Sequence, residues 1–464
     1  MKKRNRQKRQ PSLFVKCLTS VIALGAILYF GIMAIKFCLG LSMVGDYVVQ
    51  FPNESSPVVQ EPTYNATEPT ETDTGIVLPS ETARAQLLVT GDLMLHTPIL
   101  NSVRSTGEYG FDDIFQYVTP YVSKADFAVV NLETTLSGTE GGKKYTGYPK
   151  FNSPDSIVDA AGNAGFNMML TANNHCNDYG TAGLKRTLAT IQGGGLTALG
   201  TVSTTDEAGH VVMDVNGIKI GMVCYSYGQI GDDPDRPAMN GLPTDSAAAG
   251  LINAFDYNKL DVFYQEMAAQ IADMQAKGAE AIVLYIHWGD EYSTTVNDKQ
   301  RTMAQKLCDM GVDVIAGSHP HVVQGMELLT STADESHKTV CLYSMGNFLS
   351  NQRSTNVNVT TGHTEDSLLL ELTFVKYSDG NVYLEGVTVQ PTWVLVRSSG
   401  GRREYRILPL NHHSGDWAEL YGLTSSQEHN AESSYNRTME LVSPGLNTVQ
   451  TYVDENRIAR FGVG

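Results

Sequence analysis

Short apolar runs alternate with segments of helical periodicity along most of this chain, from about residue 85 to residue 348. The run AIVLYIHWG, for example, follows the helix-period segment YNKLDVFYQEMAAQIADMQAKG, which ends in a glycine suited to a C-terminal cap. This alternation predicts an α/β fold in which helices cover buried strands. We expect strands at residues 85–95, 126–133, 166–175, 218–227, 281–289, 313–321 and 340–348.

The pattern changes after Asp366, where SLLLELTFVKYSDGNVYLEGVTVQ alternates around an SDGN turn. Such alternation on both sides of a turn predicts an antiparallel hairpin. Residues 411–464 are polar and only weakly helical in pattern, so we treat them as a C-terminal extension of a main domain at residues 86–410.

Polar side chains follow five of the expected strands, at the point where each strand ends. In open α/β sheets the ligand crevice lies beyond the carboxyl ends of the strands, so these groups are expected to meet in one place. They are Asp92, then Asn131 and Glu133, then Asn173, Asn174 and His175, then His287 and Glu291, and finally His319 and His321.

This set mixes carboxylates, amide oxygens and imidazoles and contains no cysteine. Mixed nitrogen and oxygen ligands suit Zn, Mn or Fe, either as one divalent ion or as a pair. A pair of ions about 3.5–4 Å apart can activate water and hold a phosphoryl or carbonyl oxygen. In GSHPHVVQG, His319 and His321 are two residues apart, so on an extended backbone both side chains would point the same way.

Each cluster alone also has a purely structural interpretation. An Asp after a strand is commonly a cap or turn residue, the amides of ANNH can satisfy loop backbone groups, and a single buried histidine is commonly a hydrogen-bonded member of the core. Five clusters at the ends of five strands favour a shared site, because polar groups near a core cost free energy unless something pairs them.

Further residues of the same stretches could bind substrate or support the ligands. His96, four residues after Asp92, either joins the site or begins the next segment, and Glu291 either orients His287, contacts substrate or is an exposed loop acid. Asn347 of YSMGNF either lines the cavity or supports the HPH loop. Asn131, Asn173 and Asp178 complete this surrounding group.

The N-terminal part differs from the rest in composition. A basic start, MKKRNRQKRQ, precedes an apolar stretch at residues 13–41 that is long enough to cross a bilayer. This arrangement predicts a cytoplasmic tail at 1–12, a single-pass anchor at 13–41 and a main domain outside the cell, attached to the cell membrane. A cleaved signal peptide fits less well because its apolar core is shorter, about 7–15 residues, and ends in an A-x-A-like site. Residues 42–85, rich in Pro, Glu and Thr, are expected to be a disordered linker.

The charge balance bears on the possible partners. The chain has 50 acidic against 33 basic residues, a formal charge of −17, and the basic residues are enriched at the N-terminus. A field of this sign repels polyanions unless a bound cation reverses it locally, so nucleic acid is not expected as a partner.

The segments GDLMLH, NLETTL, ANNHCNDYG, HWGDEY, GSHPHVVQG and YSMGNF, in this order, resemble the CapA family of capsule (poly-γ-glutamate) synthesis proteins over about residues 86–351. That family is similar to the calcineurin-like metallophosphoesterases. The resemblance implies an α/β/β/α sandwich with a metal site at strand ends. It also implies that His175 protonates the leaving group and that the metal ligands are Asp92, Glu133, Asn174, His287, His319 and His321.

The sequence departs from the phosphoesterase pattern at three points. Methionine occupies position 94, where the pattern has a histidine; Asn131-Leu132-Glu133 replaces Gly-Asp-x-x-Asp; and Asn173 and Cys176 flank the Asn174-His175 pair. The loss of the first histidine leaves one of two metals a ligand short unless His96 or Glu133 compensates.

The resemblance implies a function in making, releasing or exporting an anionic polymer such as poly-γ-glutamate, as a metal-dependent hydrolase or transferase. Two alternatives stay open. One is a non-catalytic accessory subunit that binds polymer or the subunits of a membrane synthase. The other is a plain surface metallophosphoesterase.

Overall fold

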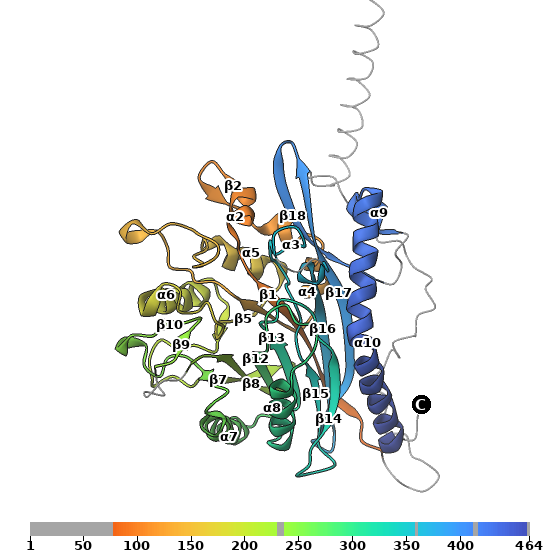
Figure 1. The fold of residues 1–464 in the computed structure, drawn as a ribbon. Helices are drawn as coiled ribbons and strands as arrows, with labels where there is room; N and C mark the ends of the chain where they lie inside the picture. The colour runs from red at the N-terminus through yellow and green to blue at the C-terminus, as the bar shows by residue number, and fades with distance from the viewer. Residues whose placement is uncertain (1–77, 230–235, 358–360, 412–415, 462–464) are drawn as a thin grey trace, which may run out of the picture. The chain divides into compact units, whose positions relative to one another are not determined.

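A computed structural model of the chain describes residues 78–229, 236–357, 361–411 and 416–461. Two large β-sheets form the centre of this part of the chain (Figure 1). In the first sheet the strand order is β18-β17-β16-β1-β4-β5-β6. In the second it is β11-β8-β12-β13-β15-β14, with β7 paired to β8.

In the first sheet, β1, β4, β5 and β6 run parallel, and the long strands β16, β17 and β18 add an antiparallel half. The strands are β1 (Glu81–Leu93), β4 (Phe127–Leu132), β5 (Met168–Leu170), β6 (Thr197–Leu199), β16 (Asp366–Tyr377), β17 (Val382–Ser399) and β18 (Arg402–Pro409).

The second sheet is parallel except for β7 and β14. Its strands are β7 (His210–Val215), β8 (Ile218–Tyr227), β11 (Ala254–Phe255), β12 (Ala281–His287), β13 (Val314–Ser318), β14 (Met326–Thr330) and β15 (Lys338–Leu342). Two short ribbons pair β2 (Arg104–Ser105) with β3 (Glu108–Tyr109), and β9 (Ala238–Met239) with β10 (Leu242–Pro243).

The strand predictions are confirmed. Each of the seven expected runs overlaps a strand, namely β1, β4, β5, β8, β12, β13 and β15, and β1 and β15 begin a few residues earlier than expected. The expected hairpin is formed by β16 and β17, which pair antiparallel on either side of the SDGN turn.

Strand alternation explains how the layers form, because successive side chains point to opposite faces of a sheet. Along β12, Val283 and Tyr285 belong to the core between the two sheets, whereas Ile282 and Leu284 pack beneath helices on the outer face. Both sheets therefore carry apolar side chains on both faces, as the predicted α/β/β/α layering requires.

Helices cover the outer faces. The outer face of the first sheet packs against α2 (Thr97–Val103), α3 (Asp112–Phe115), α4 (Thr119–Val122), α5 (Ser156–Ala164) and α6 (Gly180–Gly193). The outer face of the second packs against α7 (Leu260–Ala276) and α8 (Asp298–Asp309). Three short 3-10 turns, η1 (Glu140–Gly142), η2 (Ser246–Ala248) and η3 (His363–Glu365), and the short helix α9 (Trp417–Tyr421) complete the elements before the C-terminal helix.

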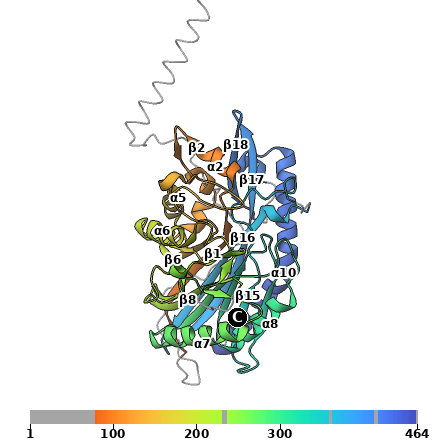
Figure 2. The same ribbon diagram turned by 60° about the vertical axis from the view of Figure 1, so that its left-hand side comes forward.

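The C-terminal region forms α10 (Ser425–Phe461), which lies along β17 and β14 (Figures 1 and 2). Its apolar side chains recur with helical spacing and join the core between the sheets. Each such side chain, when fully buried, contributes about 1.5–3 kcal/mol relative to exposure. They are Val442, Leu446, Val449 and Val453.

The membrane-spanning helix predicted at 13–41 lies outside the described residues. Among the residues that the structure describes, no helix has both the length and the apolar character needed to cross a bilayer. The longest of them, α10, alternates polar and apolar side chains along its 37 residues. The described residues therefore give no support to the predicted single-pass anchor that would hold the main domain at the cell membrane.

The packing of α10 on β14 depends on Gly445. A Cβ atom at this position would lie 1.8 Å from the carbonyl oxygen of Met326, which is backbone and has little freedom to move. We predict that Gly445→Ala lowers the free energy of unfolding by about 1–3 kcal/mol through overpacking, although alanine is the better helix former by about 1 kcal/mol. Denaturant unfolding measures this, with the exposed Asn447→Ala on the same helix as control. Equal or greater stability of the Gly445→Ala protein would contradict the close packing of α10.

Candidate metal centre

Asp92 is brought to the site by an irregularity near the end of β1. The pairing of β1 with β4 shifts register between Thr90 and Asp92. At this shift Gly91 packs directly on Gly346, since a Cβ atom on Gly91 would lie 2.0 Å from the Gly346 carbonyl oxygen. The Asp92 backbone N–H donates to the same oxygen at 2.9 Å. The bulge therefore sets the direction of a fully buried carboxylate.

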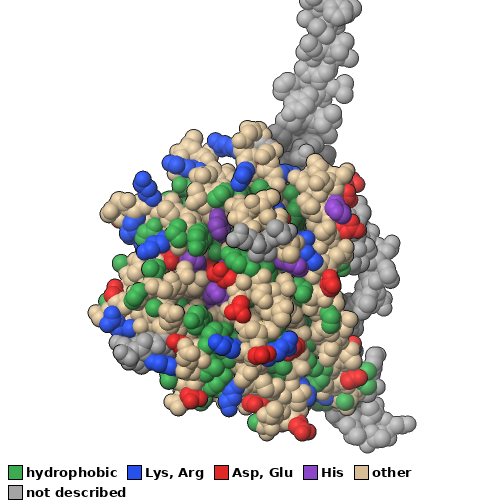
Figure 3. Space-filling model, viewed as in Figure 1, with side chains coloured by type: hydrophobic (Ala, Val, Ile, Leu, Met, Phe, Trp, Pro, Cys, Tyr) green, Lys and Arg blue, Asp and Glu red, His purple; other side chains and the backbone are tan. Residues whose placement is uncertain are grey.

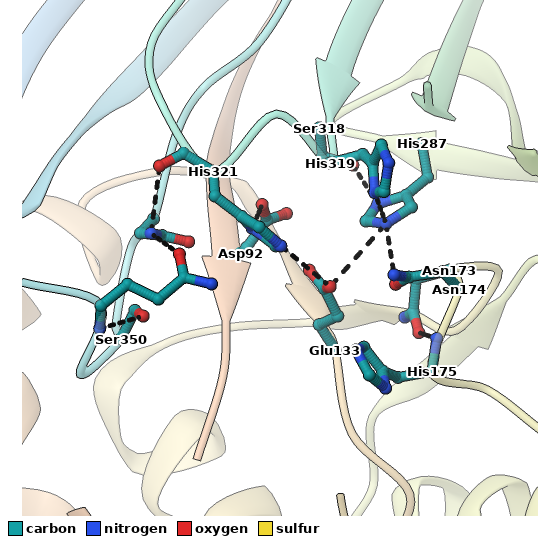
Figure 4. A network of polar contacts seen from close by, with 12 residues as sticks. Asp92, Glu133, Asn173, Asn174, His175, His287, Ser318, His319, His321 and Ser350 are labelled. Carbon is teal, nitrogen blue, oxygen red and sulfur yellow. Dashed lines mark hydrogen bonds and ion pairs between the residues drawn. The ribbon is translucent and has the colours of Figure 1, made fainter. Parts of the chain in front are cut away.

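Glu133, directly after β4, lies at the centre of the cluster (Figure 4). Its side chain is 0% exposed, and neither carboxylate oxygen has a hydrogen-bond partner among the described residues. Burial raises the pKa of Glu133 well above its ordinary value, and the charges of Asp92 and Glu291 add to the effect. A buried, unpaired carboxylate is costly, so this position requires a proton or a cation.

His287, at the end of β12, is fixed on both ring nitrogens. Nδ1 shares a hydrogen bond with Ser318 Oγ at 2.9 Å, and Nε2 lies 3.2 Å from Asn174 Oδ1 and 3.1 Å from Nδ1 of His319. Burial, followed by the nearby His319, lowers the pKa of His287 well below its ordinary value. Burial likewise lowers the pKa of His319 to about 3. Both rings are therefore neutral near pH 7, which is the form that binds metals.

The ring of His321 lies close to the carboxylates of both Asp92 and Glu133. Its Nδ1 lies 3.1 Å from Asp92 Oδ2, and its Nε2 lies 3.7 Å from Glu133 Oε1. The expectation that His319 and His321 sit on an extended backbone is wrong, because φ is +97° at His319 and +58° at His321. Pro320 between them accepts a hydrogen bond from the Tyr292 N–H at 2.7 Å. The tight left-handed turn, rather than strand alternation, directs both rings to the site.

Backbone strain, seen as positive φ at residues other than glycine, is concentrated at the site. Six non-glycine residues of the described chain have positive φ, and three of them, Tyr292, His319 and His321, belong to the HPH loop or contact it. Left-handed backbone at such residues costs of order 1–3 kcal/mol and persists where the surrounding structure enforces it. The concentration of strained residues next to buried carboxylates is typical of a functional site.

Two amides fix Asp92 from the side of β4. Asn131 Nδ2 donates to Asp92 Oδ1 at 2.8 Å, and Asn173 Nδ2 donates to Asn131 Oδ1 at 3.2 Å and to the Leu132 carbonyl at 2.9 Å. Both amides are buried. Asn131 therefore holds the Asp92 carboxylate directly, and Asn173 holds Asn131.

His175 is held by an acid of its own loop. Its Nδ1 lies 2.8 Å from Asp178 Oδ2, an oxygen that also accepts the Phe151 backbone N–H at 2.7 Å. The Phe151 ring packs edge-on against the imidazole, with centroids 4.7 Å apart. Since Asp178 engages Nδ1, the Nε2 atom of His175 is the ring nitrogen free to exchange a proton.

The remaining candidates lie around the centre. His96 sits at the rim, where its Nδ1 accepts the Asn351 N–H at 3.3 Å and its ring packs edge-on against Phe151. Glu291 is exposed in the loop after β12. Asn347 lies behind the HPH loop and donates to the carbonyl oxygen of His321 at 3.1 Å. Ser318, which orients His287, was missed from the sequence although it precedes the HPH motif directly.

The donor set fits a divalent cation. Asp92, Glu133 and His287 each offer one atom, and these atoms all lie within 4.8 Å of one another. Nε2 of His287 and Nε2 of His321 lie 3.8 and 3.7 Å from the same Glu133 oxygen, too far for hydrogen bonds. Such gaps suit atoms that share an ion, given ligand distances of about 2.0–2.2 Å. Met94, where the phosphoesterase pattern has histidine, is buried.

The raised pKa of Glu133 generates a pH prediction for protein stripped of metal by a chelator. The pKa of a glutamate in the unfolded chain is about 4.3. When the pKa in the folded state is higher, the carboxyl group contributes its full stabilisation only below about pH 4.3, and this contribution is lost as the pH rises through the folded-state pKa. Glutamine does not titrate. Glu133→Gln should therefore gain stability relative to wild type, by about 1 kcal/mol or more at pH 8 compared with pH 5.

Calorimetry in EDTA at both pH values measures this difference, and added Mn²⁺ should stabilise wild type more than the variant. An equal difference in Tm between variant and wild type at pH 5 and pH 8 would show that Glu133 is not an unpaired buried carboxylate.

The sequence of this chain also matches known proteins. Residues 86–352 match the family model described as bacterial capsule synthesis protein PGA_cap. The chain is 26% identical over 299 residues to the capsule biosynthesis protein CapA of Bacillus anthracis, covering 63% of this chain and 64% of that protein. It is 27% identical over 292 residues to the PGA biosynthesis protein CapA of Bacillus subtilis (strain 168), covering 62% and 68%. A probable polyglutamine synthesis accessory protein of Mycobacterium tuberculosis is 26% identical over 209 residues, 44% of this chain and 52% of that protein.

The family match covers more than half of the chain and contains all the candidate ligands from Asp92 to His321. The resemblance drawn from the sequence is thereby confirmed. This chain belongs to the bacterial capsule synthesis protein (PGA_cap) family.

Proposed function

We propose that this chain is a metal-dependent hydrolase or transferase that acts in making or releasing a capsule polymer of the poly-γ-glutamate type. The observation that carries the proposal is the buried carboxylate of Glu133, which lacks a hydrogen-bond partner and lies between His287 and His321. A core without function would fill this position with an apolar or a paired side chain.

The substrate class comes from the relatives. Two of them bear names for capsule or PGA biosynthesis, and the family description names capsule synthesis. The chain spans 64% of the Bacillus anthracis relative, so the polymer and the bond acted on belong to the proposal.

The side chains that would hold the metal come from both sheets. Asp92, Glu133 and Asn174 lie at or after the ends of strands of the first sheet, and His287, His319 and His321 lie at or after the ends of strands of the second. A divalent ion bound there supplies Lewis-acid polarisation of a carbonyl or phosphoryl oxygen and activates water near neutral pH. The neutral imidazoles of His287 and His319 are available as ligands without prior loss of a proton.

His175 supplies the proton transfer in this proposal. With Nδ1 bound to Asp178, Nε2 can carry the proton that a leaving group needs, and the Asp178 carboxylate stabilises the imidazolium form. Phe151 restricts the ring from one side and fixes Asp178 through its backbone N–H.

A non-catalytic accessory role is the second candidate. It is favoured by the buried Met94, which removes a ligand from the two-metal pattern. One relative carries the name of a probable accessory protein of polyglutamine synthesis. In this role the crevice would bind polymer or a synthase subunit without breaking a bond.

The test replaces His175 in a polymer-producing host that lacks its own copy of the protein. We predict that His175→Ala lowers the amount of polymer about 10²-fold or more, the usual contribution of a general acid. The metal content of the purified variant should be unchanged, because the Nε2 proton and not a ligand has been removed. The exposed His429→Ala on α10 is the control and should leave polymer production unchanged. Full production with His175→Ala would contradict the enzymatic role and favour the accessory role.

A further inference from the structure

The loop at residues 138–150, GTEGGKKYTGYPK, is basic although the chain as a whole has a formal charge of −17. Lys144 and Lys150 are exposed, and Lys143 donates from Nζ to the Ser137 carbonyl at 2.8 Å. The one acid of the loop, Glu140, lies 3.9 Å from the guanidinium of Arg186. We call Lys143, Lys144 and Lys150 the basic rim.

Asn152 holds the loop in place with its side chain and its backbone. Asn152 Nδ2 donates to the Gly138 carbonyl at 2.9 Å and to the Lys144 carbonyl at 3.0 Å. Asn152 also exchanges backbone hydrogen bonds of 2.9 Å with Thr146. The basic rim is therefore presented by an ordered loop rather than by a free tail.

This loop borders the candidate metal centre. The Gly147 N–H donates to Thr97 Oγ1 at 3.2 Å, and a Cβ atom on Gly147 would lie 2.8 Å from the Cα atom of His96. On the other side Thr146 Oγ1 lies 3.1 Å from the hydroxyl of Tyr179, next to Asp178. Figure 3 shows lysine and arginine side chains gathered on the face where the histidines appear, above and to the left of them.

An exposed aromatic ring completes the loop. Tyr148 is 71% exposed, the highest value among the large hydrophobic side chains of the described residues. The residue before it, Gly147, packs against the backbone of His96 at the rim of the site. Tyr148 thus stands at the mouth of the site, where an aromatic face can pack on the methylene groups of a polymer.

A polyanion faces an electrostatic barrier at this site. The net negative charge of the chain repels it, whereas positive charges at a cleft raise the local concentration of an anionic ligand. We propose that the basic rim, with Tyr148, binds a flexible chain of repeated carboxylates and leads it to the metal centre. This inference rests on the proposed function, because it deepens the choice of substrate at the same site.

The test is binding of fluorescein-labelled poly-γ-glutamate to the full chain, followed by anisotropy in EDTA so that no turnover occurs. At 50 mM NaCl, Lys144→Gln/Lys150→Gln should bind about tenfold more weakly than wild type. At 500 mM NaCl the two should agree within about twofold, because exposed charges are screened. Tyr148→Ala should lose about threefold at both salt concentrations, since its contact is apolar.

The matched control is Lys124→Gln/Lys306→Gln, which removes the same charge from an exposed position just before β4 and from one in the last turn of α8, ahead of β13. It should bind within twofold of wild type. An equal loss in both double variants would overturn the proposal, as would tighter binding of inorganic polyphosphate than of poly-γ-glutamate of equal charge. Because this binding is measured in EDTA, it does not depend on a bound metal, so failure of the metal assignment and failure of the basic rim are separate outcomes.

Discussion

A carboxylate without a partner, buried between two imidazoles, determines how the rest of this molecule has to be built. Taking Glu133 out of water costs several kcal/mol unless a proton or a cation compensates. Burial of apolar side chains on both faces of the two sheets offsets this cost, and the parallel strands of the sheets end at one rim. The strand ends are where side chains can meet without interrupting the ladder of backbone hydrogen bonds, and five of them contribute to this cluster.

The support for the centre extends beyond the region matched by the family model, residues 86–352. From α10, Arg437 and Ser434 both bind the carboxylate of Asp366, at the start of β16. The Asp366 carbonyl accepts the Asn347 N–H, and the Asn347 side chain holds the carbonyl of His321. A helix near the C-terminus therefore helps to hold the strained HPH loop, in addition to covering the core between the sheets.

The sequence predicted the strands and the meeting of their ends, because buried strands leave continuous apolar runs and polar clusters mark where those runs stop. It did not predict α10. Its apolar positions, Val442, Leu446, Val449 and Val453, have helical spacing, but Pro444 and Gly445 lie among them and lower the local helix propensity. Packing against β17 and β14 outweighs that preference.

The alternation of side chains along a strand also could not predict where the His319 and His321 side chains point. Their direction depends on a left-handed turn that is held by distant contacts. The apolar length at residues 13–41 predicted a membrane span that no described helix supports.

The most direct measurement of the central claim is anomalous X-ray scattering from crystals of this chain grown with Mn²⁺. A strong anomalous peak bounded by Glu133, His287 and His321 is the expected result, with Asp92 or Asn174 completing the coordination. A fully ordered site without such a peak, or manganese bound only elsewhere on the molecule, would contradict the account.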